Sequence, residues 1–298
     1  MVFWIMNKQL KADLGLLSIT VFWGSTFIIS KLTLLEIPLL LFLVMRLGLA
    51  ALMIDLIALK QWRHLNTKII SHGFILGSLL YASYFFQMWG IQYTSASNAG
   101  FITGLSVVMV PVFGFFLDGS KPSLTVTIGI ILAVTGLFLL TGADLFSWNG
   151  GDLLVLICAV TVAFHILYTG KFAPQHNVLL LTAVQLSTVA LLAASALMFY
   201  DFSATEISGK AYRAVIYLAA FGTVYPYLMQ TQMQKFTTTT RTALIFSMEP
   251  VFSALFAYLV AKEMLSLSGW LGGALIVLGM IFSELPLQKI GVFNKRQT

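Results

Sequence analysis

The sequence predicts an all-α polytopic membrane protein. We expect ten transmembrane helices, arranged as an inverted 5+5 repeat with both termini in the cytoplasm. Three observations lead to this prediction: the composition is strongly apolar, the apolar residues form ten runs long enough to span a bilayer, and the second half of the chain repeats the first.

The composition excludes a soluble protein and a disordered one. Of the 298 residues, 59% are hydrophobic and only 9% are charged, whereas about 25% of residues are charged in a typical soluble domain. One soluble core could not cover so many apolar side chains. The single cysteine, Cys158, excludes a disulfide framework within the chain and a cysteine-cluster metal site. The net charge of +6 does not indicate a nucleic-acid partner, because the basic residues lie scattered in short loops.

Ten apolar runs approach the roughly 20 residues that a helix needs to cross a bilayer. The loops between them are too short to fold as separate soluble domains. The first six residues form too short an apolar stretch for a cleaved signal peptide. The predicted spans are 14–30, 38–59, 70–91, 98–117, 124–141, 153–169, 178–199, 213–233, 242–261 and 267–284.

The lysines and arginines set the expected orientation. With the N-terminus inside, twelve of the seventeen fall on the cytoplasmic side, four on the outside, and Arg46 lies within a span. Since cytoplasmic loops carry the excess of basic residues, this ratio predicts that both termini lie in the cytoplasm.

The chain repeats itself at an offset of 143 residues. Positions 84–136 match positions 227–279 at twelve places without a gap, and the matches include Tyr84 with Tyr227 and Gln87 with Gln230. The start of the chain fits a slightly different offset, which aligns Asp13 with Asp152. We therefore divide the chain into a first repeat, 1–142, and a second, 143–298. Because each repeat holds an odd number of spans, the second must enter the membrane from the opposite side, as in many secondary transporters.

Several short motifs, in their order and spacing, resemble the EamA-like family of the drug/metabolite transporter superfamily. The resemblance covers nearly the whole chain. Its motifs are Trp23-Gly24-Ser25-Thr26-Phe27 with Lys31, Arg46 after Pro38, the stretch 93–99, Arg241-Thr242-Ala243-Leu244, Glu249-Pro250, Glu263, Gly272 and Gly279.

This resemblance implies ten helices, an inverted repeat and the movement of small organic solutes, often outward. The sequence departs from the family pattern at Ser120, where the family often carries a glutamate equivalent to Glu263. The departure puts a role for a first-repeat acid in doubt, but not the fold.

Ionisable groups inside spans are costly and indicate function by default. His165 is either a proton carrier or a hydrogen-bonded structural histidine. Glu249 precedes Pro250, which breaks the helix, so its carboxylate could hold a proton, a cation or an amine, or serve packing. Arg46 could bind a substrate carboxylate, but we favour a structural ion pair.

Uncharged polar residues indicate a substrate cavity between the repeats. Tyr84 and Gln87 share one helix face, and Tyr227 and Gln230 repeat the arrangement in the second half. Such faces suit a partly apolar solute, although interfacial aromatic belts are the alternative. The predicted substrate-binding residues are Trp23, Tyr81, Tyr84, Gln87, His165, Tyr168, Tyr227 and Gln230.

No catalytic, nucleotide or metal motif is present. The chain has no Gly-x-x-x-x-Gly-Lys-[Ser/Thr] loop and no His-Glu-x-x-His motif, and its four histidines lack ligand spacing. We therefore expect no enzyme activity and no cofactor.

Taken together, the sequence predicts a secondary transporter of the bacterial inner membrane that exports small organic metabolites such as amino acids by alternating access. A homodimer is compatible with the small-residue seams. Two alternatives stay open: a lipid or lipid-linked sugar translocator on the same fold, and a membrane scaffold that transports nothing.

Overall fold

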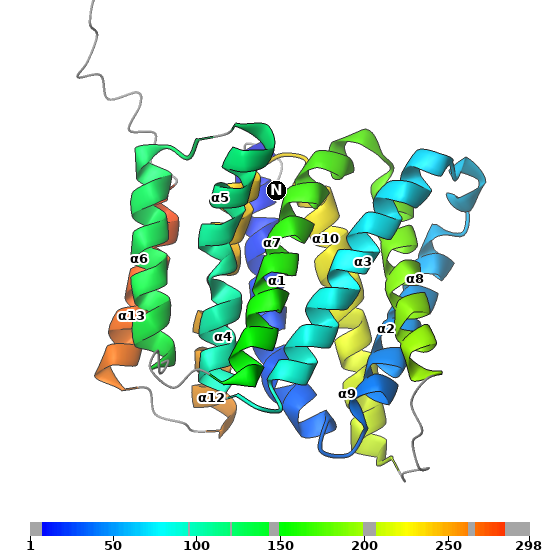
Figure 1. The fold of residues 1–298 in the computed structure, drawn as a ribbon, viewed down its shortest axis with the longest axis horizontal. Coiled ribbons are helices and arrows are strands. Elements are labelled where there is room, and N and C mark those ends of the chain that lie inside the picture. The colour runs from blue at the N-terminus through cyan, green and yellow to red at the C-terminus, as the bar shows by residue number, and fades with distance from the viewer. Residues whose placement is uncertain are drawn as a thin grey trace, which may run out of the picture.

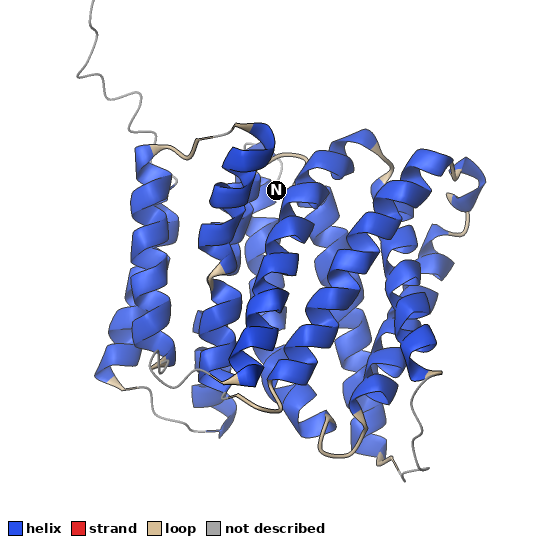
Figure 2. Ribbon diagram, viewed as in Figure 1, coloured by secondary structure: helices blue, strands red, loops and turns tan. Residues whose placement is uncertain are grey.

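The structure is a computed structural model, and it describes residues 8–94, 96–119, 121–142, 149–198, 207–261 and 266–283. These residues form helices and loops and contain no strand (Figure 2). Ser120, where the sequence departs from the family pattern, and Glu263, its counterpart in the second repeat, lie outside the described residues.

Thirteen α-helices follow one another in the described chain. They are α1 Lys8–Thr33, α2 Leu39–Ala58, α3 Thr67–Gly90, α4 Ala96–Gly104, α5 Ser106–Asp118, α6 Leu124–Thr141, α7 Gly150–Phe172, α8 Val178–Leu197, α9 Gly209–Ala219, α10 Tyr225–Met233, α11 Thr239–Phe246, α12 Glu249–Ala261 and α13 Leu267–Ser283. A π-helical turn, η4 Ala220–Val224, joins α9 to α10.

Seven helical segments of the described residues are long and apolar enough to cross a membrane. They are Lys8–Thr33, Leu39–Ala58, Thr67–Gly90, Ala99–Asp118, Leu124–Thr141, Gly150–Gln175 and Val178–Leu197. They coincide with the first seven predicted spans. The last three predicted spans contain helices that are shorter or interrupted.

The helices stand side by side in one bundle (Figure 1). At one edge α6 packs against α13, and at the other edge α2 packs against α8. Between these edges α1 packs against α10 and α12, while α3 and α5 pack against α7. Every one of these pairs joins a helix from the first half of the chain to one from the second, so the halves are interleaved rather than separate.

Four glycines bring α6 and α13 into close contact. A methyl group on Gly136 would lie 2.5 Å from the carbonyl oxygen of Gly272, and one on Gly129 would lie 2.7 Å from that of Gly279. Glycine permits this approach of two backbones because it has no side chain. Gly129 contacts Gly279, and Gly136 contacts Gly272. Residue numbers therefore rise along α6 while they fall along α13, which means that the two helices run antiparallel.

Two of the predicted spans are broken in their middle. Only Leu105 separates α4 from α5, and only Ser247 and Met248 separate α11 from α12. Pro250 has no N–H, so the carbonyl of Phe246, four residues earlier, cannot receive its usual helical hydrogen bond. The second break therefore has a cause in the sequence.

Two similar contacts tie α1 and α7 to the bundle near their N-terminal ends. The Thr237 hydroxyl donates to Asp13 Oδ1 at 3.2 Å, and the Thr94 hydroxyl donates to Asp152 Oδ1. The two contacts lie at opposite ends of the bundle, since α1 begins at the top of Figure 1 and α7 at the bottom. We call them the Asp13 contact and the Asp152 contact.

Candidate functional site

The bundle encloses a cavity of about 330 Å³ between helices of both halves of the chain. Its walls include nine of the residues singled out from the sequence: Trp23, Arg46, Tyr84, Gln87, His165, Tyr227, Gln230, Glu249 and Pro250. Both helix breaks open onto it, through Gly104 and Ser106 at the first and through Ser247 and Glu249 at the second.

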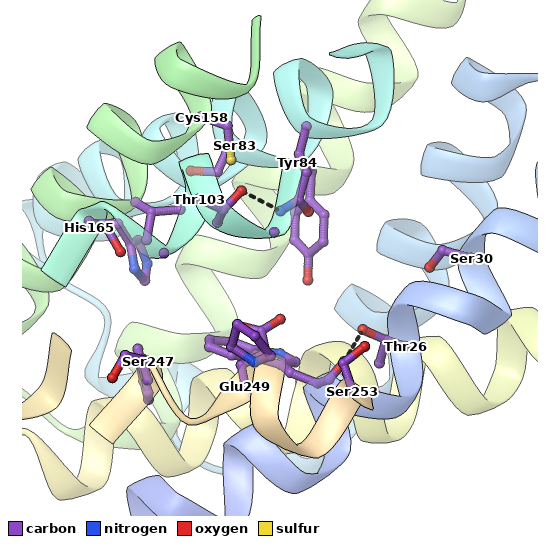
Figure 3. Close-up of a pocket in the computed structure, with 18 of the residues that line it drawn as sticks. Thr26, Ser30, Ser83, Tyr84, Thr103, Cys158, His165, Ser247, Glu249 and Ser253 are labelled. Carbon is purple, nitrogen blue, oxygen red and sulfur yellow. Dashed lines mark hydrogen bonds between the residues drawn. The ribbon is translucent and has the colours of Figure 1, made fainter. Parts of the chain in front are cut away.

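The polar side chains reach the cavity from two sides. In Figure 3 Tyr84, Thr103 and His165 lie on one side, and Ser247, Glu249 and Ser253 lie on the other. The first group comes from α3, α4 and α7, and the second comes from the break before α12 and from α12 itself. A solute in this cavity would therefore touch both halves of the chain.

Arg46 occupies one corner of the cavity and is only 2% exposed. It donates to the Gly222 carbonyl and the Thr223 hydroxyl, each at 3.1 Å, and to the hydroxyls of Tyr84 at 3.3 Å and Ser30 at 3.4 Å. Its guanidinium carbon also lies 4.8 Å from the centre of the Tyr84 ring, which is within cation–π range.

The chain makes this corner by distorting a helix. Pro226 has no N–H and therefore leaves the carbonyl of Gly222, four residues earlier, without a helical donor. The π-helical turn η4 lies at the same place, and π-turns of this kind often mark functional sites. The freed Gly222 oxygen accepts from Arg46 at 3.1 Å and from the Trp23 indole N–H at 3.3 Å.

This geometry corrects the structural ion pair expected for Arg46. Arg46 forms no ion pair with any residue that the structure describes, whereas Arg241 pairs with Asp13 at 3.0 Å. The acceptors around Arg46 are all uncharged, because the kinked helix supplies a carbonyl where we expected a carboxylate. A buried cation therefore faces the cavity with no anion beside it.

His165 is held by a glutamine rather than by a charged group. Its Nε2 lies 3.2 Å from Gln185 Oε1, and Gln185 Nε2 donates to the Thr231 hydroxyl at 3.3 Å. The His165 ring also meets the Tyr227 ring edge-on, with centroids 5.5 Å apart. If Gln185 donates to Thr231, its oxygen accepts from Nε2–H, so the arrangement fits a neutral imidazole.

The two repeated glutamines have different surroundings. Gln87 is partly buried and donates to the Thr103 hydroxyl at 3.4 Å. Gln230 is 1% exposed and donates to Gln234 at 2.8 Å, and Gln234 in turn donates to the Ile166 carbonyl at 3.0 Å. The side-chain oxygen of Gln230 is buried and has no hydrogen-bond donor. An acceptor thus remains unsatisfied at the cavity wall.

Glu249 begins α12 and lies in its first turn. The N-terminal end of a helix favours a carboxylate there, because its free N–H groups carry partial positive charge. Among the described residues Glu249 accepts no hydrogen bond and joins no ion pair. Its carboxyl group therefore stays available to whatever enters the cavity.

Two residues predicted to bind substrate lie elsewhere. Tyr81 stacks on Phe85, and Tyr168 stacks on Phe164 and Phe172. Neither tyrosine is part of the cavity wall. Each step of three residues turns the side chain by about 60° around the helix axis, so Tyr81 lies about 120° from Gln87 and leaves the face that Tyr84 and Gln87 share.

Sequence reasoning missed the small hydroxyl residues of the cavity, which are Thr26, Ser30, Ser83, Thr103, Ser106, Thr141, Ser247 and Ser253. A lone serine or threonine in an apolar span usually bonds back to its own helix, as Ser83 and Ser247 do here. The one signal available was adjacency to the break that Pro250 announces, which applies to Ser247. In the described chain no three histidine, cysteine or acidic side chains come together as a metal site would need.

The chain resembles proteins that are named as transporters. An uncharacterized transporter of Archaeoglobus fulgidus is 31% identical over 280 residues, which cover 93% of this chain and 87% of that protein. The uncharacterized transporter YoaV of Bacillus subtilis is 21% identical and covers 94% of this chain and 99% of its own. A solved crystal structure shares the fold, with a TM-score of 0.80 at 18% identity, and covers 95% of this chain and 100% of its own.

A family model matches the chain twice, over residues 10–142 and again over 149–285. The matched family consists of transporters, which points to a membrane transporter rather than an enzyme. Together with the apolar helices and the 31% identical relative, these matches identify the chain as a multi-pass membrane protein that belongs to the EamA-like transporter family.

Proposed function

We propose that the protein is a secondary transporter of the cytoplasmic membrane that exports small organic metabolites such as amino acids by alternating access. The observation that carries this proposal is the polar cavity, which is built from both halves of the chain at the breaks of two helices. Discontinuous helices that present polar groups to a central cavity are typical of transporter substrate sites.

We further propose ten spans in an inverted 5+5 arrangement. The helices after each break support it, because α5 and α12 have the same length and are offset by 143 residues at both ends, the offset of the sequence repeat. Similarly, α2 and α8 are offset by 139 residues at both ends, the offset that aligns Asp13 with Asp152. The two successive matches of the family model, with one in each half, also support it.

The glycine contacts add a geometric argument for inversion. By the offset of 143, Gly129 is equivalent to Gly272 and Gly136 to Gly279. The contacts are crossed, with Gly129 on Gly279 and Gly136 on Gly272. A two-fold axis between equivalent helices requires this pattern, since a contact from i to j must recur from j to i.

The Asp13 and Asp152 contacts are related in the same way. Asp13 of the first half meets Thr237 of the second, and Asp152 of the second half meets Thr94 of the first. We propose that they close opposite ends of the substrate path. Opening one while keeping the other would expose the cavity to one side of the membrane at a time.

Thiol accessibility tests this proposal. A Ser253→Cys variant in a Cys158→Ala background places one thiol at the cavity wall, and a serine-to-cysteine change is small. We expect membrane-impermeant thiol reagents to label it from each side of the membrane, and substrate to change the two rates in opposite directions. Labelling from one side under every condition would favour a scaffold.

Coupling to protons would involve Glu249 in preference to His165, because the His165 ring already forms a hydrogen bond with the uncharged side chain of Gln185. We expect Glu249→Gln to lower transport in proteoliposomes more than His165→Gln does, and to remove its pH dependence. Rates that do not depend on pH in the parent and in both variants would indicate facilitated diffusion instead.

A further inference from the structure

A second hollow, with a volume of about 310 Å³, lies between α8 and α10. Val178 and Leu179 of α8 form one wall, and one face of α10 between Tyr225 and Met233 forms the other. All of its lining residues are partly exposed, and none belongs to the wall of the central cavity. We call this hollow the α8–α10 groove. Because α8 is long and apolar enough to cross a membrane, the groove opens toward lipid.

The groove runs inward from one end of the bundle. Val178 and Leu179 are the first two residues of α8, and Met233 is the last residue of α10, so these three residues mark its mouth. Tyr225 begins α10 and lies about 12 Å deeper, since a helix rises by about 1.5 Å per residue. The hydrocarbon of one leaflet is about 15 Å deep, which is half of the bilayer core. The groove therefore has the depth of an acyl chain in a single leaflet.

The side chains of the groove suit a lipid. Leu228, Met229 and Met233 are apolar, and the unbranched methionines can adapt to an irregular acyl chain. Gln232 brings an amide to the groove, next to Met233 at the mouth, and it forms no hydrogen bond with a described residue. The ester carbonyls of a glycerophospholipid lie at this depth, just above the acyl chains. The Gln232 amide can donate to one of them.

Two lysines lie at the mouth beside the end of α10. Lys235 comes two residues after Met233. Lys171 lies in the last turn of α7, next to Gly170, where an added methyl group would lie 3.6 Å from Gln234 Nε2. The ends of α7 and α10 therefore place both ammonium groups on the same side of the groove.

A third lysine lies at the mouth beside the start of α8. Lys68 precedes His72 by one turn of α3. The His72 ring lies 2.7 Å from that of His176, measured from Nδ1 to Nε2, and His176 comes two residues before Val178. Lys68 is exposed. The mouth of the groove is therefore basic on both walls.

The lysines, rather than the apolar wall, decide which lipid the groove prefers. The tails of all phospholipids offer similar hydrocarbon, so burying one tail does not distinguish one headgroup from another. A lysine near the membrane surface favours an anionic headgroup by about fivefold. Lys68, Lys171 and Lys235 form no salt bridge with a described residue, so their charges are available to a headgroup.

We propose that the α8–α10 groove binds one anionic phospholipid from the leaflet at this end of the bundle. One acyl chain lies along α10, an ester carbonyl accepts from Gln232, and the phosphate lies among Lys68, Lys171 and Lys235. This site is separate from the central cavity and does not depend on which solute that cavity takes.

The test compares two phospholipids with the same acyl chains. Palmitoyl-oleoyl phosphatidylglycerol is anionic, and palmitoyl-oleoyl phosphatidylcholine has no net charge. Each is added to the detergent-purified full chain. Native mass spectrometry counts the bound lipids, and thermal unfolding measures the stabilisation that a ligand of the folded state produces. We expect one phosphatidylglycerol per chain, bound at least about tenfold more tightly than phosphatidylcholine. Equal affinities would overturn the proposal.

A triple variant removes the basic mouth. Lys68→Gln, Lys171→Gln and Lys235→Gln together should reduce the preference for phosphatidylglycerol to about twofold or less, because the remaining contacts are with uncharged parts of the lipid. Thermal unfolding with each lipid measures the preference. A preference that survives the triple change would overturn the assignment of the phosphate to these lysines.

The matched control removes the same amount of charge far from the groove. Lys31→Gln, Lys210→Gln and Arg213→Gln change exposed residues in the last turn of α1 and at the start of α9. This variant should keep the tenfold preference. An equal loss in both triple variants would assign the preference to the net charge of the protein and would overturn the proposed site.

A bulky side chain tests the groove itself. Gln232→Trp fills the groove without breaking a described hydrogen bond, and it should abolish the tightly bound phosphatidylglycerol. Leu191→Trp, at a position of α8 that is 71% exposed, is the matched control and should bind lipid as the parent does. If Gln232→Trp does not fold, the two triple variants still decide the question.

The same mass spectra detect the competing occupant, which is a second copy of the chain. A parent that carries no lipid and is dimeric, and that Gln232→Trp converts to a monomer, would make the groove an interface between copies and would overturn the proposal.

Discussion

The two ends of the bundle are built at equivalent positions of the repeat but differ in chemistry. At the Asp13 contact a cation is added, since Arg241 pairs with Asp13 at 3.0 Å. At the Asp152 contact none of the described residues supplies a cation: the carboxylate accepts from Thr94 and from the backbone N–H of Asn149 at 2.9 Å, in a capping box at the start of α7.

A second pair of positions repeats this difference. His72 and His176 lie 2.7 Å apart between Nδ1 and Nε2, at the end of the bundle where α3 begins. The offsets of 143 and 139 make Val215 and Ile37 their equivalents at the other end. Both of these are buried apolar residues of one core cluster. One end therefore joins through an ion pair and a pair of histidines, and the other joins through a carboxylate cap, a hydrogen bond of 3.3 Å from the Ser208 N–H to Glu36, and apolar packing.

The repeat thus preserves the backbone positions at which the two halves are in contact, but it does not preserve the side chains that make the contacts. Equivalent backbone positions meet because the two halves pack in the same way, and different side chains serve at each meeting point. Salt can screen the Asp13–Arg241 ion pair at one end, and the histidine pair there can titrate near neutral pH, whereas the contacts described at the other end include neither an ion pair nor a histidine. Under the proposed alternating-access mechanism, the two directions of opening would then respond differently to conditions on the two sides of the membrane.

The glycine seam between α6 and α13 is the part that should behave alike in both halves. We expect Gly136→Ala and Gly129→Ala each to destabilise the protein by about 1–3 kcal/mol, because the new methyl group meets a backbone carbonyl that cannot move aside. Thermal unfolding in detergent measures this. Gly48→Ala is the matched control, since nothing lies within 4 Å of its added methyl group. The free energy of unfolding of the Gly48→Ala variant should rise by about 0.5–1 kcal/mol.

The two aspartates should behave unequally. Asp152 is 1% exposed and satisfies both a helix cap and a buried hydroxyl, so Asp152→Ala should cost about 2–3 kcal/mol. The Asp13 side chain is 15% exposed and its ion pair is partly solvated, so Asp13→Ala should cost about 1 kcal/mol. Thermal unfolding of both variants at low and high salt compares them, and only the Asp13 contact should weaken with salt. Equal losses of stability in the Asp13→Ala and Asp152→Ala variants would contradict the difference between the two ends of the bundle.

The sequence predicted the regular spans well. The span 124–141 coincides with α6, and 178–199 differs from α8 by two residues, because long apolar runs leave little choice at membrane length. The break before α12 also had a visible cause in Pro250. The matching break at Leu105 had none, since the nearest following proline, Pro111, lies well inside α5. That break is a property of packing against neighbouring helices.

The site was harder to predict than the fold. The repeated pairs Tyr84 with Gln87 and Tyr227 with Gln230 all reach the cavity, because the repeat marks equivalent faces. The partners of Arg46 could not be foreseen, since its principal acceptor is a carbonyl that is free only because Pro226 lies four residues later in a distorted helix. Long-range pairing of this kind has no signature in a single sequence.

The smallest expected effect is a pH dependence confined to the end that carries the histidine pair. Partial burial, and then the nearby His72 and Lys68, hold the pKa of His176 below its ordinary value of about 6.5. The folded state therefore binds fewer protons than the unfolded state just below pH 6.5, so stability falls as pH falls through that range. We expect labelling of Ser253→Cys from this end to rise between pH 7.5 and about 5.5.

His176→Gln should remove that pH dependence, and His64→Gln should leave it unchanged, because His64 is exposed in the neighbouring loop and bonds only Arg63. Labelling from the opposite end should not follow the same curve, since Ile37 and Val215 cannot titrate. An equal pH response at both ends would place the titrating group in the shared cavity, at Glu249 or His165, and would remove the distinction between the two ends.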